Sequence, residues 1–398
     1  MKVFDGVKIV ARAEHKDSVD QRYRPVLGPG IEFFEVPYYL GPWQYARVWR
    51  RVRKAVRSAV ADDDAVLCRV GSRLATDLLP MLWKTGRPYG LEVVGDPSEG
   101  FAPRAVKHPL RPVFRYLFTR SLKQECSRAS AVSYVTEHAL QQHYPARDAA
   151  ISFSASDVEL CDDSFVPLAR VFITPLSGGF PHEHKLQTPD KGTRPRLVFV
   201  GSLAQMYKAP DVLIRAISLL HKKGFPVWLS IIGDGRHRRE LEDLTRSLSV
   251  DSRVTFCGQL QAGAAVRKKL DEATLMVMPS RTEGLPRALV EAMARALPCV
   301  GTKVGGIPEL LDAEDLVTPN DADGLADKLQ EVLTDPERLT RMSASNLAKA
   351  QRYRIEVLEE KRRKFYRYLR NATEKRLANG KFSSDFSDAP PLVDEAFQ

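Results

Sequence analysis

The sequence predicts an α/β protein with two domains, each built around a parallel sheet. The chain has 398 residues, about twice the usual size of one domain. Apolar, β-branched runs alternate with amphipathic helical stretches along both halves, as they do in βαβ units. In the second half, consecutive strand-to-helix turns carry glycine at intervals of roughly 25–30 residues, which is typical of a parallel sheet. Apolar residues make up 43% of the chain, enough to form substantial cores.

Five apolar segments predict the strands of the first domain, which we assign to residues 1–185. They are 7–11, 65–70, 89–95, 131–135 and 171–174, with helices expected between them. The third segment ends in Gly95-Asp96-Pro97, and an aspartate in this position is typical of a turn or a helix cap. Thr136 and Glu137 follow the fourth segment, where they either cap a helix or contact a substrate, and capping is the commoner role.

The second domain is assigned to residues 186–350. Before it, the polar segment 182–195 contains proline and glycine and is the best candidate for a linker. The predicted strands of this domain begin at residues 196, 227, 254, 275 and 299. Because ligands of parallel α/β sheets bind outside the carboxyl ends of the strands, we expect the functional site at the turns that follow these strands.

The most informative turn follows the strand that begins at residue 275. Glu283 and Gly284 lie in the turn, and Pro286 opens an alanine-rich helix that carries Glu291. The free N–H groups of a helix N-terminus suit a phosphate. Two carboxylates beside them suit the vicinal hydroxyls of a sugar or a ribose, because carboxylate oxygens accept strong hydrogen bonds. The alternative is a solvated helix face next to an unrelated loop charge.

Glu283 and Glu291, with seven residues between them, resemble the paired glutamates of retaining glycosyltransferases of the GT-B fold, specifically family 4 of the sequence classification. The resemblance implies two Rossmann-like domains that face each other across an interdomain cleft. It also implies that Glu291 binds the ribose hydroxyls of a nucleotide and that Glu283 contacts the donor sugar.

The segment 196–220 is similar to the diphosphate-binding segment of the same family. In that family a basic residue just after the strand glycine, here Gly201, and a lysine six positions later hold the diphosphate. Lys208 matches the lysine. Ser202 occupies the other basic position, and its hydroxyl compensates poorly for a lost guanidinium.

The resemblance therefore implies a complete set of site residues. The implied donor-binding residues are Gly201, Ser202, Lys208, Gly233, Glu283, Gly284, Leu285 and Glu291. The implied catalytic residues are Lys208, Glu283 and Asp96, the last because relatives place a polar residue near the scissile bond. For Asp96 the alternative remains the turn or helix cap described above.

The two ends of the chain depart from or extend this pattern. Residues 1–6 run directly into VKIVAR, which resembles the second strand of the family, so we expect its first strand and glycine-rich loop to be absent. The charged stretch 337–377 predicts a long helix. The resemblance implies that residues 351–378 cross back onto the first domain, and the alternative is a solvated helix of the second domain alone. Residues 379–398 predict a disordered tail.

The formal net charge is +10, and basic residues are interleaved with apolar ones in 46–57 and 104–123. This pattern predicts a peripheral contact with an anionic membrane. A normally packed, solvated basic helix is the alternative, and nucleic-acid binding is not expected because no recognised nucleic-acid module is present. No apolar run approaches the ~20 residues that span a bilayer, and no signal peptide is recognised, so we expect a cytoplasmic protein, located in part at the inner face of the membrane.

The cysteines and the charged motifs give no indication of a cofactor. Five widely spaced cysteines predict reduced thiols in a cytosolic protein. No Cys–His cluster and no Asp-x-Asp pattern with metal-ligand character was recognised. We therefore expect no metal and no cofactor other than a nucleotide-diphosphate sugar as co-substrate.

Together, these features predict transfer of a sugar from a nucleotide-diphosphate donor to a glycan or lipid-linked acceptor, with retention at the anomeric carbon. Cell-surface polysaccharide or glycolipid synthesis is the expected setting. Two alternatives remain open: a sugar-nucleotide epimerase of the same fold, and a non-catalytic module that binds a nucleotide sugar or a partner protein.

Overall fold

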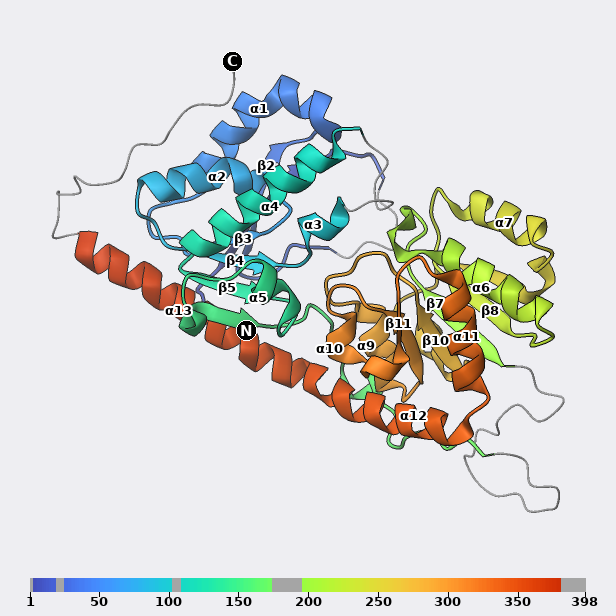
Figure 1. Cartoon of the computed structure of the whole chain (residues 1–398). Coiled ribbons are helices and arrows are strands. Elements are labelled where there is room, and N and C mark those ends of the chain that lie inside the picture. Colours follow the sequence, from blue (N-terminus) through green and yellow to red (C-terminus); the bar gives the residue numbers. More distant parts are fainter. Residues whose placement is uncertain (1–2, 19–24, 102–108, 174–194, 381–398) are drawn as a thin grey trace. The chain divides into compact units, whose positions relative to one another are not determined.

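The computed structural model describes residues 3–18, 25–101, 109–173 and 195–380 (Figure 1). By contacts, the chain divides into two compact units. Of the described residues, unit 1 contains those from 1–91, 128–131 and 363–398, and unit 2 contains those from 92–127 and 132–362. The predicted boundary between residues 185 and 186 falls outside the described residues, as does most of the predicted linker, so both remain predictions.

A six-stranded sheet forms the centre of unit 2. Its strand order is β12 (Leu316–Val317), β11 (Cys299–Thr302), β10 (Leu275–Met278), β7 (Arg196–Val200), β8 (Trp228–Ile232) and β9 (Val254–Gly258). Every neighbouring pair of these strands is parallel. The α/β fold with parallel sheets that the sequence predicts is therefore confirmed, and the carboxyl ends of all six strands lie along one edge.

The strands nearer the N-terminus form two further sheets. β1 (Val7–Ala13) and β2 (Ile31–Pro37) make a parallel pair. A four-stranded sheet has the order β3 (Val66–Arg69), β4 (Tyr89–Val93), β5 (Ala131–Tyr134) and β6 (Ser152–Ser154). The predictions of strands at 7–11, 65–70, 89–95 and 131–135 are confirmed.

The predicted strand at 171–174 is wrong for its described part, residues 171–173. Hydroxyls of a helix bind one N–H group of this segment and the N–H group just before it: Phe172 N donates to Thr340 Oγ1 (3.0 Å) and Arg170 N to Ser343 Oγ (2.7 Å). The side chain of Phe172 is buried in the core of the six-stranded sheet. An apolar run thus contributes to a core without pairing as a strand.

Thirteen α-helices lie within the described residues. They are α1 (Gly41–Ser58), α2 (Arg73–Lys84), α3 (Pro97–Gly100), α4 (Arg111–Arg128), α5 (Ala139–His143), α6 (Pro210–Lys222), α7 (Arg238–Ser247), α8 (Ala264–Asp271), α9 (Arg287–Ala294), α10 (Ile307–Leu310), α11 (Ala322–Leu333), α12 (Pro336–Ala350) and α13 (Ile355–Gly380). The basic segment 46–57 lies in α1, and the described part of 104–123 lies mainly in α4. None of these helices is both long enough and apolar enough to cross a membrane.

The charged stretch 337–377 is not one helix. α12 ends at Ala350, a 3-10 turn follows at Gln351–Tyr353, and Arg354 is extended before α13 begins. From Arg363 onward α13 belongs to unit 1, where Phe365 and Leu369 pack over Gly90. Residues 381–398, which include most of the predicted tail, lie outside the described residues.

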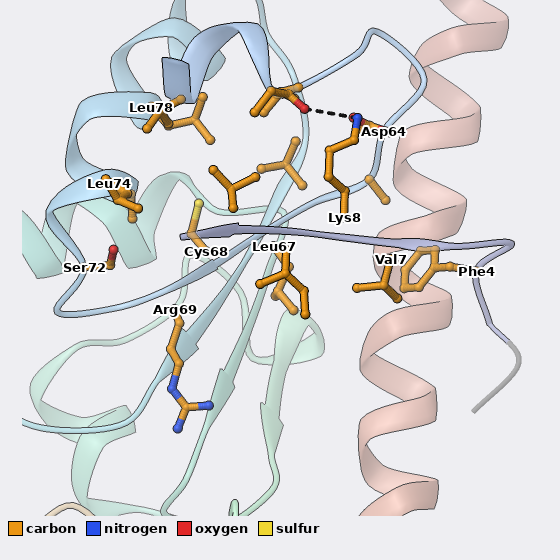
Figure 2. Close-up of a pocket in the computed structure, with 18 of the residues that line it drawn as sticks. Phe4, Val7, Lys8, Asp64, Leu67, Cys68, Arg69, Ser72, Leu74 and Leu78 are labelled. Atoms are coloured by element: carbon orange, nitrogen blue, oxygen red, sulfur yellow. Dashed lines mark hydrogen bonds and ion pairs between the residues drawn. The ribbon is translucent and has the colours of Figure 1, made fainter. Parts of the chain in front are cut away.

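Unit 1 contains a cavity of about 550 Å³ (Figure 2). Four consecutive residues of β1, Val7–Val10, and all four residues of β3 line it. Because successive side chains of a strand point to opposite faces, a cavity lined by consecutive residues lies at the strand edges. At one end the Lys8 ammonium lies 3.7 Å from the Asp64 carboxylate. The cavity therefore lies between the edges of β1 and β3. These two strands belong to separate sheets and do not pair with each other.

Candidate functional site

All the predicted site residues except Asp96 follow three neighbouring strands of the six-stranded sheet, β10, β7 and β8. Gly201 follows β7, Gly233 follows β8, and the turn 279–286 follows β10. The loop after β11 reaches this turn, because Gly306 N donates to Gly284 O (2.7 Å). All four segments therefore lie at the carboxyl edge, where parallel α/β sheets bind their ligands.

Lys208 and Glu283 form an ion pair at this edge. Lys208 Nζ lies 2.7 Å from Glu283 Oε1, and the side chains are 14% and 7% exposed. Ser280 Oγ donates to the same carboxylate oxygen (2.7 Å). The structure thus joins two residues that are 75 positions apart in the sequence, as the prediction of a shared site requires.

Arg281 holds the two halves of this ion pair in place. Its guanidinium makes a bidentate contact with the Asp211 carboxylate (2.9 and 2.7 Å) and donates to Met206 O (2.5 Å). Its backbone N–H donates to Tyr207 O (2.7 Å). Since Lys208 ends the 3-10 turn Met206–Lys208, Arg281 fastens the segment of Lys208 to the turn of Glu283. No sequence signal indicated this role.

The loop after β7 leaves no room for a side chain at Gly201. A Cβ added there would lie 2.5 Å from Lys208 Cδ, so the lysine stem passes directly over this glycine. A Cβ on Gly233 would lie 1.9 Å from Gly201 O. Ser202 is exposed, and its hydroxyl accepts a hydrogen bond from Ala204 N (3.2 Å). The glycines let the two loops approach closely and set the path of the Lys208 side chain.

The turn after β10 is packed on its other side as well. A Cβ on Gly284 would lie 2.4 Å from Val94 O, and the Leu285 side chain is buried. Pro286 occupies the N-cap position and α9 begins at Arg287, so the expectation that proline is the first helical residue is wrong by one position. Boundary shifts of this size are common at helix ends.

Glu291 lies on α9, apart from the ion pair. Burial raises the pKa of its carboxyl group, and the nearby Arg287 and Arg267 guanidinium groups oppose this shift. Within the described residues, Glu291 makes no hydrogen bond or ion pair, whereas both Lys208 and Glu283 do. The structure therefore joins one of the two predicted glutamates to the lysine and leaves the other available to a ligand.

Asp96 is the N-cap of α3. Its Oδ1 accepts a hydrogen bond from Ser98 N (2.7 Å) and one from the Tyr144 hydroxyl, and its Oδ2 lies 2.8 Å from His143 Nδ1. Burial would raise the pKa of Asp96, but the hydrogen bonds from Tyr144, His143 and Ser98 outweigh it, so the pKa lies below its usual value. Of the two alternatives for this residue, the contacts favour the cap. Thr136 Oγ1 accepts from the N–H of Leu140, the second residue of α5 (3.0 Å), while His138 occupies the N-cap position.

Glu99, which the sequence did not indicate as a site residue, contacts Thr282, the residue before Glu283. Its Oε2 accepts from Thr282 Oγ1 (3.0 Å) and its Oε1 from Gly305 N (3.3 Å). Burial raises the pKa of this carboxyl group. Glu99 thus connects the segment after β4 with the two loops that follow β10 and β11.

Glu309 connects α10, which follows β11, with the start of α5, which follows β5. Its carboxylate on α10 accepts hydrogen bonds from the backbone N–H groups of Glu137 (2.6 Å), His138 (3.0 Å) and Ala139 (2.6 Å). Ala139 is the first residue of α5, His138 is its N-cap and Glu137 precedes the cap. N–H groups at a helix start have no carbonyl partner within the helix, and Glu309 supplies the acceptor. Glu137 in turn pairs with Lys361 of α13 (3.0 Å).

Within the described residues, no group of His, Cys, Asp and Glu side chains is arranged to hold a metal ion. The five cysteines are free. Cys126 is buried in the core, and burial raises the pKa of its thiol to about 12. Cys161 is exposed.

Part of the chain matches a known protein family. Residues 194–335 match the family described as Glycosyl transferases group 1. Protein CapJ of Staphylococcus aureus is 25% identical over 323 residues, which cover 81% of this chain and 75% of CapJ. The comparisons indicate a glycosyltransferase.

Solved structures support the fold. Sucrose-phosphate synthase from Thermosynechococcus elongatus has a TM-score of 0.68 at 17% identity, over 92% of this chain and 89% of that one. Anabaena HepE in complex with UDP-glucose has a TM-score of 0.58 at 14% identity, over 94% of this chain and 99% of that one. Both are GT-B glycosyltransferases, so the predicted GT-B fold is confirmed.

Proposed function

We propose that the protein is a retaining glycosyltransferase, which moves a hexose or a related sugar from a nucleotide-diphosphate donor to a glycan or lipid-linked acceptor. The observation that supports it most is the Lys208–Glu283 ion pair, 2.7 Å between Nζ and Oε1, at the carboxyl edge of the sheet. A cation there suits the donor diphosphate, and a carboxylate beside it suits the sugar hydroxyls. Cell-surface polysaccharide or glycolipid synthesis is the proposed setting.

In the proposed reaction, the bond between the anomeric carbon and the β-phosphate oxygen breaks, and negative charge grows on that phosphate. The Lys208 ammonium and the N–H groups near Gly284 and Leu285 stabilise this charge. The acceptor hydroxyl attacks from the same face, which gives retention, and its proton passes to the departing phosphate. Positioning and charge stabilisation, rather than a protein nucleophile, supply the catalysis.

Glu291 is proposed to bind the ribose. Its carboxylate is desolvated and makes no hydrogen bond within the described residues, and two vicinal hydroxyls would supply the missing donors. Gly201, Ser202 and Gly233 would line the diphosphate. Because Asp96 is occupied by its cap contacts, we assign it a positioning role in the loop before Glu99.

The deciding experiment is incubation of the full chain with UDP-, GDP-, ADP- and dTDP-sugars, with nucleoside diphosphate release as the readout. UDP-sugars come first because HepE was solved with UDP-glucose. Release of the diphosphate, with an α-linked product from an α-linked donor in the proton NMR spectrum, would support the proposal. A β-linked product would contradict retention. An altered sugar configuration without transfer would identify an epimerase, and binding without turnover across the panel would identify a non-catalytic module.

The proposal includes no metal and no nucleic acid, and it places the protein in the cytoplasm, in part at the inner face of the membrane. Lys208 and the backbone N–H groups neutralise the diphosphate without a divalent ion. Activity that is unchanged by EDTA would support this part, and activity restored only by Mg²⁺ or Mn²⁺ would contradict it.

A further inference from the structure

The first half of α4 carries an apolar surface that faces solvent. Leu110, directly before α4, and Val113, Tyr116 and Leu117 in its first half are each at least 51% exposed, and we call these four residues the apolar stripe. The helical period places positions 110, 113 and 117 on one line. The other face of α4 is packed in its second half, where Leu122, Glu125 and Cys126 are buried.

Aromatic contacts hold the first half of α4 in place. The Phe101 ring stacks on the Phe118 ring with a centroid distance of 5.4 Å, and it lies 6.1 Å from the Phe114 ring. The stripe is therefore exposed on an anchored helix. A group of exposed apolar side chains on an anchored element indicates a surface that binds something.

The charges around the stripe are of one sign. Arg115, Arg120 and Lys123 are exposed and form no ion pair within the described residues. The sequence contains no Asp or Glu from residue 102 to residue 124. The first acidic residue, Glu125, is buried and accepts a hydrogen bond from Ser121 (2.8 Å). The surface therefore has a net positive charge that nothing on α4 itself neutralises.

We propose that α4 is the surface by which the protein binds an anionic lipid bilayer. The apolar stripe enters the headgroup region, and Arg120 and Lys123 beside it lie against the anionic headgroups. Charge complementarity selects this partner over a second copy of the chain, because two stripes in contact would bring the same cations together. Membrane binding can be measured whether or not the protein transfers a sugar.

The test uses the full chain and sedimentation with vesicles of phosphatidylcholine, with and without 30% phosphatidylglycerol. We expect binding only to the anionic vesicles and a clear loss of binding as salt rises from about 50 to 300 mM. Arg120→Ala/Lys123→Ala should lower the partition coefficient roughly 30-fold, since each cation contributes about five- to sixfold. Val113→Ser/Leu117→Ser should lower it by at least about tenfold.

The matched control is Lys222→Ala/Arg239→Ala. It removes two exposed cations from α6 and α7 of unit 2, which also form no ion pair within the described residues. This control should bind anionic vesicles as the wild type does. All six substituted positions are exposed, so unchanged unfolding midpoints would show that the variants are folded.

Three outcomes would overturn the proposal. The first is equal binding to neutral and anionic vesicles, or no binding to either. The second is a loss of binding in the control as large as in the α4 variants, because the net charge alone would then account for it. The third is a concentration-dependent dimer that Val113→Ser/Leu117→Ser abolishes, which would assign the stripe to a second copy of the chain.

Discussion

Lys208 Nζ lies 2.7 Å from Glu283 Oε1, and both side chains are largely buried. A charge in such a place is stable only while its partner is present. The pair therefore determines both the stability of the carboxyl edge and the electrostatics of the proposed donor site, and the two effects can be separated by mutation.

The ion pair predicts non-additive stability effects. Lys208→Met and Glu283→Leu should each lower the free energy of unfolding by about 3–5 kcal/mol, because each leaves one buried charge uncompensated. The double variant should recover most of this loss. Urea unfolding of the four proteins measures the cycle, and equal, additive losses would show that the two charges do not interact.

Activity should behave differently from stability in the same variants. The double variant Lys208→Met/Glu283→Leu should stay inactive although it regains stability, because the proposed cation is gone. In Lys208→Met, turnover should fall by about 10²-fold or more, and the nucleotide-sugar dissociation constant should change much less. Equal losses in turnover and in binding would argue against charge stabilisation in the transition state.

Gly201→Ala should disturb the lysine without touching its charge. The added Cβ would lie 2.5 Å from Lys208 Cδ, so the side chain must move and turnover should fall by at least about tenfold. Gly95→Ala is the control, since a Cβ there would meet no atom within 4 Å. If both alanine variants retained full turnover, the path of the Lys208 stem would not matter.

Glu291→Gln should strengthen the fold and weaken nucleotide binding. Burial raises the pKa of Glu291, so its ionised form is the costly one in the folded protein. A carboxyl group whose pKa is raised in the folded protein lowers the free energy of unfolding as the pH rises through that pKa. The glutamine variant should therefore exceed the wild type in unfolding free energy at pH 8, and the difference should shrink as the pH falls through the raised pKa of Glu291.

Calorimetric titration with the nucleoside diphosphate tests the other half of this prediction. Glu291→Gln should raise its dissociation constant by about tenfold, because a neutral amide oxygen accepts weaker hydrogen bonds from hydroxyls than a carboxylate does. A variant with unchanged nucleotide affinity would remove Glu291 from the proposed ribose site, whatever its stability.

Glu309→Ala should loosen the start of α5. The carboxylate accepts three hydrogen bonds from backbone N–H groups, and the loss of a charged acceptor costs about 1.5–3 kcal/mol. Amide hydrogen exchange should then increase at Glu137, His138 and Ala139. Glu309→Gln, which keeps an acceptor, should show a smaller increase, and unchanged exchange in both would contradict the contact.

Much of the fold could be predicted because strand and helix signals are local. The β-branched runs at 196 and 275 and the glycines after them mark strands and turns without reference to distant residues. The segment 171–173 shows where this approach fails. Its Phe172 side chain is buried in the core, but the Phe172 N–H is bound by the hydroxyl of Thr340, about 170 positions away, and the N–H of Arg170 just before the segment by that of Ser343.

The candidate site was predictable only where it resembles a known motif. Lys208 and Glu283 were found through their motifs, and the structure brings them together. Glu99 and Glu309 were missed because their partners are distant in the sequence. Glu99 accepts from the Thr282 hydroxyl and the Gly305 N–H, 183 and 206 positions away, and Glu309 accepts from backbone N–H groups about 170 positions away. Backbone groups leave no trace in the identity of the residue that carries them, so no pattern of side chains could have indicated the contacts with these N–H groups.

The closed Lys208–Glu283 pair has a consequence for selectivity. Because the carboxylate already serves as counter-ion to the ammonium, free sulfate or phosphate gains little by approaching the lysine and would leave Glu283 without its cation. A ligand that offers an anion to one side chain and hydroxyl groups to the other compensates both at once. On this view an intact nucleotide sugar displaces the internal pair more readily than its released nucleotide does, which favours departure of the product after transfer.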